Sequence, residues 1–287
     1  MLTAEHPAGV PAADVVMARA ETENFPVASR LLPRRERRDL LAIYGFARLV
    51  DELGDSAPGD RLAALDWLEQ ELDRAFAGCA HHPLLVTLQP TLQQRRLPRA
   101  PFARLIEANR IDQRVAAYET WEQLRAYCAL SADPVGELVL GVFAVADAEL
   151  IAMSDAICTG LQLVEHCQDV AEDLAVGRVY LPAEDLRRFG CAQAELGRAH
   201  AGEPLRQVLA FEVARARSLF DEGAPLLGRL SGRPLLAVAA FLAGGRATAD
   251  AIERAGYDVL AGAPGAGRGR VAVALARALA GRRRASR

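Results

Sequence analysis

Lysine is absent from this sequence, so all 34 basic residues among its 287 are arginine. Without a lysine amine the chain cannot form a Schiff base, bind pyridoxal phosphate covalently or build a Walker-type phosphate loop. Cysteine is scarce as well. The five cysteines are odd in number, and none stands in a C-x-x-C motif. This usage predicts buried free thiols in a reducing compartment rather than disulfides or a metal site.

Long apolar runs and targeting signals are also missing. No run approaches the ~20 apolar residues that span a bilayer, and the N-terminus lacks the basic start and apolar core of a secretion signal. The formal charge of -3 shows no basic bias, so nucleic acid is not an expected partner. A hydrophobic content of 51% supplies ample core. We therefore expect a cytoplasmic protein.

Strand patterning is nearly absent, and Pro and Gly separate segments with helical periodicity. The sequence predicts an all-α protein, a single-domain helical bundle spanning residues 21–262 between an N-terminal segment (1–20) and a C-terminal part (263–287). The expected helical segments are 14–23, 34–55, 61–78, 83–97, 101–118, 121–143, 161–176, 184–189, 192–200, 204–222, 233–261 and the tail. Pro134 and Gly136 predict a kink within 121–143.

An acidic row lies in the stretch from Gly160 to Pro182. On a helical period one stripe carries Gln162, Glu165, Asp169 and Asp173, with His166 and Glu172 at its edge. Like charges one turn apart destabilise a helix, so a cation is expected to neutralise them, and Mg²⁺ suits carboxylates and substrate phosphates. Gly177 is expected to end this helix, and Arg178 to offer a donor fork to a phosphate. Taken alone, such a row is more often a solvated face.

A second acidic row argues against the interpretation that the first row is only a solvent-exposed helix face. Tyr44, Arg48, Asp51 and Asp55 are spaced four, three and four residues apart, and Glu52 stands beside them. This spacing places them on one helical face. Two helices whose carboxylates face each other across a bundle core would hold divalent ions and a diphosphate.

Other polar and aromatic residues leave two readings open. Tyr127, two turns before the kink, is either a core aromatic or a hydroxyl that reaches a cavity. We expect His81 and His82 to be a surface pair, Asn109 to lie on a solvated face, and Arg215 to point outward.

The C-terminal part is basic and rich in glycine. GAPGAGRGR at 262–270 lacks a preceding strand, so we expect a flexible linker rather than a dinucleotide site. The following VAVALARALAGRRRASR is either the last helix of the bundle or a basic amphipathic patch that touches a membrane peripherally.

Three segments together carry a family resemblance. They are ENFPVASRLLPRRERRDLLAIYGFARLVDELGD, YCALSADPVG and LQLVEHCQDVAEDLAVGRVYLP. In this order they resemble the squalene and phytoene synthase family of all-α isoprenoid enzymes with a central apolar cavity, and more narrowly its branch in bacterial hopanoid pathways. The resemblance covers roughly residues 20 to 260.

The resemblance implies roles for the residues of both rows. The implied Mg²⁺ ligands are Asp51, Glu52, Asp55, Glu165, Asp169 and Asp173. The implied catalytic residues are Tyr44, Arg48 and Tyr127, and the implied substrate-binding residues are Arg48, Gln162, Arg178 and Tyr180. Implied partners are a prenyl diphosphate substrate and sequential enzymes of squalene synthesis, with no nicotinamide cofactor.

The branch implies one reaction, conversion of presqualene diphosphate to hydroxysqualene. Condensation of two farnesyl diphosphates to presqualene diphosphate, squalene or phytoene, and a non-catalytic module with this fold, remain alternatives. Four positions depart from the wider family. They are Glu52 for Asp, Glu165 for Asn, Gln168 for Arg, and Gly245 where an aromatic is expected before Arg246.

Overall fold

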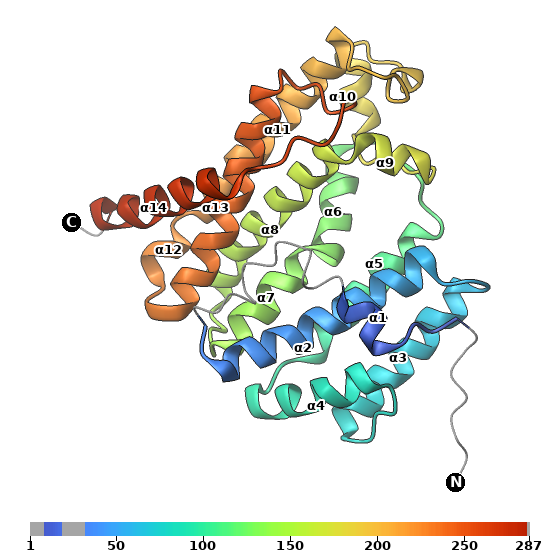
Figure 1. Ribbon diagram of the computed structural model, residues 1–287, viewed down its shortest axis with the longest axis vertical. Helices are drawn as coiled ribbons and strands as arrows, with labels where there is room; N and C mark the ends of the chain where they lie inside the picture. The colour runs from blue at the N-terminus through green and yellow to red at the C-terminus, as the bar shows by residue number, and fades with distance from the viewer. Residues whose placement is uncertain (1–8, 19–31, 286–287) are drawn as a thin grey trace. The chain divides into compact units, whose positions relative to one another are not determined.

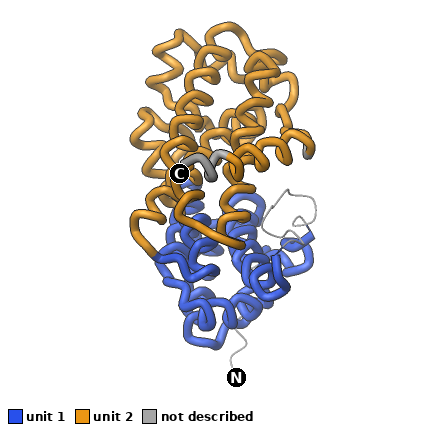
Figure 2. Tube along the Cα trace, turned by 90° about the vertical axis from the view of Figure 1, so that its left-hand side faces the viewer, with its two compact units in different colours: residues 1–114, 134–146 blue, residues 115–133, 147–287 orange. Residues whose placement is uncertain are grey.

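The computed structural model describes residues 9–18 and 32–285, and the ENFPVAS motif lies outside them. The described residues are helical apart from turns and one isolated β-bridge between Ala117 and Val179. The predicted all-α class is thus confirmed. The chain divides into two compact units, residues 1–114 with 134–146 and residues 115–133 with 147–287 (Figure 2).

Unit 1 is organised around the long helix that carries the first acidic row. Its helices are α1 (Ala13–Ala18), α2 (Arg34–Asp51), η3 (Glu52–Ser56), α3 (Arg61–Ala77), α4 (Pro83–Arg95), α5 (Arg99–Asp112) and most of α7 (Asp133–Val142). Helix α2 packs against α1, α4 and α5. Fully buried Phe46 of α2 meets Phe102 of α5 edge to face, with ring centroids 5.1 Å apart. This aromatic core fixes α2 against α5.

Unit 2 is organised around α8 (Ala148–Gln168), which runs beside α11 and α13 (Figure 1). Its other elements are α6 (Trp121–Ser131), α9 (Val170–Ala175), α10 (Ala183–Arg188), η4 (Gln193–Glu195), α11 (Glu203–Gly223), α12 (Leu226–Arg229), α13 (Gly232–Arg254) and α14 (Arg268–Ala285). A Cβ on Gly160 of α8 would lie 2.8 Å from the Phe220 ring of α11. Glycine at 160 therefore permits the close approach of these two helices.

Several predicted boundaries differ from the structure. The helix expected from Leu161 to Val176 is interrupted at Asp169, whose φ of -97° and ψ of 19° separate α8 from α9. The segment 192–200 contains only the short turn η4, so that helix prediction is wrong. The segment 121–143 breaks at Ala132 into α6 and α7, next to the proline that predicted a kink. Residues 19–23 of the first expected helix lie outside the described residues.

Helix α13 is, in the described ranges, the one helix long and apolar enough to cross a membrane. However, 61% of its most apolar window is buried inside the protein, as in the core helix of a soluble domain. The sequence itself shows no uninterrupted apolar run of that length. The charged residues near its end, such as Arg246 and Glu253, shorten the run as read along the chain.

Candidate active site

The first acidic row sits where α2 turns into the π-helical turn η3. Tyr44 is buried on α2, and the Arg48 guanidinium lies 3.1 Å from Glu52 Oε1 and 3.7 Å from Asp51 Oδ2. Asp51 remains half-exposed and Asp55 is exposed. π-Helical turns are rare and are frequent at functional sites. The row therefore presents two accessible aspartates, with Arg48 and Glu52 paired beside them.

Helix α5 supports this turn with two amide side chains. Gln113 Nε2 donates to the carbonyl of Gly54 at 2.9 Å, and Asn109 Nδ2 lies 3.5 Å from Asp51 Oδ1. A Cβ on Gly54 would lie 2.0 Å from Asn109 Oδ1, so only glycine allows the approach. Asn109 is buried, which overturns the expectation of a solvated face. No local pattern signals the burial of Asn109, because its partner Asp51 lies 58 residues away in the chain.

The second acidic row ends in a defined helix cap. Gly177 takes the left-handed φ of 81°, its N–H donates to Leu174 O at 3.0 Å, and Arg178 N–H donates to Asp173 O at 2.8 Å. This pair of bonds is a Schellman motif. The predicted cap at Gly177 is thus present, and it fixes Arg178 beside Asp173.

Carboxylates on α8 and α9 raise each other's pKa. Burial, followed by the charge of Asp169, raises the pKa of Asp173 to about 7, although Arg178 acts in the opposite direction. Glu165 and Glu172 add smaller increases. Burial and then Glu172 also raise the pKa of Asp169. Burial is therefore the main cause of both increases, and repulsion between the carboxylates adds to it beyond what Arg178 offsets at Asp173.

The donor chemistry of the row suits a hard divalent cation. Mg²⁺ takes one or two protein carboxylates and fills its other positions with water and phosphate oxygens, so Asp169 and Asp173 are a donor set of the right size. Among residues 9–18 and 32–285, no three acidic, histidine or cysteine side chains form a cluster that could hold a metal ion. The assignment of metal ligands therefore stays a prediction.

Four aromatic side chains lie next to this row in unit 2. The ring of His166 stacks on Tyr180 with centroids 3.9 Å apart, and Tyr127 lies 5.6 Å from Tyr180. Tyr118 completes the cluster at 5.3 Å from Tyr127. All four are buried, and burial lowers the pKa of His166 to about 3, so its ring is neutral. Tyr127 is thus part of an aromatic cluster rather than an isolated core residue.

A small cavity of about 10 Å³ joins the aromatic cluster to the acidic row. Its lining includes His166, Asp173, Arg178 and Tyr180. The Nε2 atom of His166 is buried and has no hydrogen-bond partner in the structure. A polar cavity of this size holds about one water molecule. Sequence reasoning had placed His166 only at the edge of the stripe.

Gln168 and Gln162 occupy different settings on α8. Gln168 Nε2 donates at 2.7 Å to the carbonyl of Pro264, in the glycine-rich segment before α14. Gln162 is half-exposed on α8, two turns before Asp169. Gln168, which stands where the wider family is expected to have arginine, therefore connects the segment before α14 to the residue next to Asp169.

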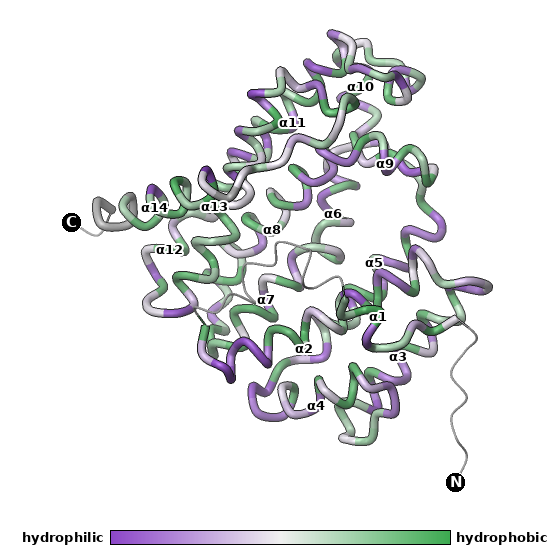
Figure 3. Tube along the Cα trace, in the orientation of Figure 1, coloured by the Kyte–Doolittle hydropathy of each residue, from purple (hydrophilic) through white to green (hydrophobic). Residues whose placement is uncertain are grey.

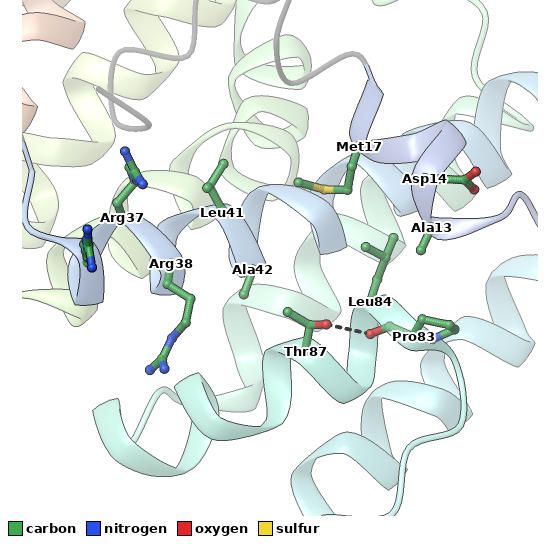
Figure 4. A pocket seen from close by; sticks show the side chains of 11 residues that line it. Ala13, Asp14, Met17, Arg37, Arg38, Leu41, Ala42, Pro83, Leu84 and Thr87 are labelled. Atoms are coloured by element: carbon green, nitrogen blue, oxygen red, sulfur yellow. Dashed lines mark hydrogen bonds between the residues drawn. The ribbon is translucent and has the colours of Figure 1, made fainter. Parts of the chain in front are cut away.

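A separate groove of about 520 Å³ lies along α1, α2 and α4 in unit 1 (Figure 4). Arg37 and Arg38 lie at one end, Leu41 and Met17 along the middle, and Asp14 at the other end. The groove thus has basic side chains at one end and an aspartate at the other.

The all-α fold has counterparts among solved structures. The fold is that of the isoprenoid synthases, and a solved dehydrosqualene synthase in complex with ligand shares it, with a TM-score of 0.84 at 23% identity over 93% of this chain and 95% of that one.

The sequence matches the squalene/phytoene synthase family over residues 18–277, and the chain belongs to that family. It is 37% identical over 205 residues to the hydroxysqualene synthase of Zymomonas mobilis, covering 69% of this chain and 68% of that protein. It is 36% identical over 217 residues to that of Sinorhizobium fredii, covering 72% and 71%. The crystal structure of squalene synthase HpnC from Alicyclobacillus acidocaldarius is 47% identical, with a TM-score of 0.79 over 85% of this chain and 94% of that one.

Proposed function

We propose that this protein is an Mg²⁺-dependent enzyme that converts the prenyl diphosphate presqualene diphosphate to hydroxysqualene in hopanoid synthesis. One observation carries the proposal. Asp169 and Asp173 bear more negative charge than Arg178 offsets, and they lie beside a buried aromatic cluster. A divalent cation would neutralise the first feature and could in turn bind a diphosphate, and a carbocation on a hydrocarbon chain would suit the second. The relatives named hydroxysqualene synthase support the choice of reaction within the family.

The reaction breaks one carbon–oxygen bond and forms another. The diphosphate leaves with the bonding electron pair, the cyclopropylcarbinyl cation rearranges, and a water oxygen attacks it and loses a proton to solvent or diphosphate. When bound at the aspartates, Mg²⁺ supplies positive charge to the leaving group. No reductant is consumed, so no nicotinamide cofactor is required.

The residues of this chain are proposed to bind the diphosphate, to shield the carbocation from water and to position the binding groups. Arg178 and Arg48 offer guanidinium donors to diphosphate oxygens, a geometry that favours bidentate bonding. Tyr127 and Tyr180 present π faces that stabilise positive charge on carbon and exclude bulk water. Tyr44 lies on α2 one turn before Arg48 and supports its position. Gln162 would hydrogen-bond the diphosphate.

The test is incubation of the purified protein and Mg²⁺ with presqualene diphosphate or farnesyl diphosphate, without nicotinamide, and identification of the lipid. An alcohol formed from presqualene diphosphate alone supports the proposal. Presqualene diphosphate formed from farnesyl diphosphate would instead make the protein a farnesyl transferase, and turnover of neither substrate would make it a non-catalytic module.

Variants of the two rows test the ligand assignment. Asp51→Ala and Asp169→Ala should each reduce turnover at least ~100-fold, because a misplaced reacting group costs about that much. Asp221→Ala is the matched control, since Asp221 is exposed on α11 and only pairs with Arg246 at 2.6 Å. Near-normal turnover of both row variants would remove the metal assignment. Circular dichroism would show that the helices persist.

A further inference from the structure

Positive charge is concentrated at one end of this sequence. Residues 268–287 contain seven arginines and no acidic residue. The other 27 arginines and all 37 acidic residues lie before residue 268, which leaves that part with a formal balance of -10. The chain up to residue 267 is therefore acidic on balance, whereas residues 268–287 are purely basic.

The structure places most of this segment in α14, which packs on α13 and α12 within unit 2. Half-buried residues recur along α14 with helical period, namely Val271, Ala274, Leu275, Ala278 and Leu279. The other face is exposed, and Val273 on it is 51% exposed. No described side chain of α14 is buried, so the helix lies on the surface of the unit.

Arg270 and Arg277 lie on the exposed face, two turns apart with Val273 between them. Among the residues that the structure describes, neither guanidinium has an ion-pair partner. Apolar residues occupy most of this helix between its arginines (Figure 3), and nine of the ten residues from 271 to 280 are apolar. The half-buried apolar face packs within unit 2, so the exposed face with Arg270 and Arg277 is the part of α14 that a negatively charged partner can reach.

We propose that α14 docks this protein on the surface of an anionic phospholipid bilayer. Charge complementarity supports this partner, because each basic side chain near an anionic leaflet contributes attraction that salt screens. Nucleic acid fits less well. The segment 262–287 has no aromatic residue on which a base could stack, and the rest of the chain would repel a polyanion.

The docking helix begins close to the candidate active site. Gln168, which precedes Asp169, donates a hydrogen bond to the carbonyl of Pro264. Four further residues lead to the start of α14 at Arg268, and they span at most about 14 Å when extended. A bilayer bound to α14 would thus lie near the second acidic row, where a water-insoluble substrate must arrive.

The experiment is cosedimentation of the full chain with vesicles of phosphatidylcholine, with and without phosphatidylglycerol. We expect binding only to the anionic vesicles at low salt, and release at about 1 M salt, where the Debye length is about 3 Å. Arg270→Gln/Arg277→Gln should weaken binding about 25-fold, at about fivefold per arginine. Arg270→Lys/Arg277→Lys should bind like the unmodified chain, because the attraction depends on charge.

Arg187→Gln/Arg198→Gln is the matched control, since both arginine side chains are exposed in unit 2 and each pairs with one glutamate, Glu119 or Glu195. Three results would overturn the proposal. They are unchanged binding of the Arg270→Gln/Arg277→Gln variant, equal binding to neutral and anionic vesicles, and loss of binding in the Arg187→Gln/Arg198→Gln control. The proposal would also be overturned if single-stranded DNA, added at the same phosphate concentration as the lipid, released all of the protein from the vesicles. Docking does not depend on the proposed reaction, because turnover of detergent-dispersed substrate is measured separately and should survive the glutamine substitutions.

Discussion

Replacement of Asp173 by asparagine should stabilise the metal-free protein while it removes a proposed metal ligand. Burial and then Asp169 raise the pKa of Asp173 from 3.8 to about 7. A rise of this size corresponds to about 4 kcal/mol of unfavourable interaction with the ionised form. Because the side chain is only half-buried, solvent screening reduces the expected gain in the free energy of unfolding to about 1–2 kcal/mol.

The sign of the effect follows from the raised pKa. At low pH both the folded and the unfolded chain hold the proton, so Asp173 costs nothing. As the pH rises above 3.8 the unfolded chain releases its proton first, and the cost grows until the folded carboxyl ionises at about 7. The gain from Asp173→Asn should therefore be complete at about pH 8 and nearly absent at about pH 4.

Urea unfolding of the metal-free protein at these two pH values measures the gain, and a thermal melt should rise by about 2–6 °C at the higher one. Glu222→Gln is the control, since Glu222 is exposed on α11, belongs to neither acidic row and should change stability little. The reasoning is refuted if Asp173→Asn leaves the unfolding midpoint unchanged or lowers it at about pH 8. Addition of Mg²⁺ with diphosphate should narrow the difference, because a cation relieves the same repulsion.

Three further substitutions probe the supporting structure. Gly54→Ala should cost about 1–3 kcal/mol and reduce turnover, because its Cβ would meet Asn109 Oδ1 at 2.0 Å; wild-type unfolding and turnover would contradict this. Glu71 is buried, and although burial opposes it, hydrogen bonds from the two backbone amides at the start of α4 hold its pKa at about 2. The stability that ionised Glu71 adds to the folded protein should therefore be lost as the pH falls from 4.5 toward 2. Glu71→Ala should lower the free energy of unfolding by about 2–4 kcal/mol at neutral pH. An acid-unfolding curve that is the same for the variant and the wild type would contradict this. Burial raises the pKa of Glu212 to about 8, so the melting temperature should fall as the pH rises from about 5 to 8. Glu212→Gln should make the melting temperature less dependent on pH in this range. The same pH dependence in both proteins would contradict this.

Local patterns predicted the features that depend on neighbouring residues in the chain. The glycine cap at Gly177 was readable because a helix end needs a residue in the left-handed region. The break between α6 and α7 was readable because Pro134 cannot continue the hydrogen-bond ladder of the preceding turn. The row from Tyr44 to Asp55 was readable from spacing alone, although the π-helical turn within it was not.

Features that depend on distant partners were not predictable. His82 was expected at the surface, yet it is buried because its backbone N–H and that of His81 donate to Glu71, about ten residues earlier. Arg215 was expected to point outward, yet it is half-buried and lies 2.9 Å from buried Asp185, 30 residues earlier in the chain. In each case a buried carboxylate on another segment or turn determines the outcome, and one sequence gives no sign of that pairing.

The central claim is that the Asp169/Asp173 row holds Mg²⁺ and the diphosphate of the substrate. A crystal structure of the protein with Mg²⁺ and a non-reactive thiodiphosphate analogue of the substrate tests it most directly. We predict that oxygens of Asp169 and Asp173 lie about 2.0–2.1 Å from Mg²⁺ ions that also bind the diphosphate. Ions that neither aspartate touches, or a diphosphate bound away from this row, would contradict it.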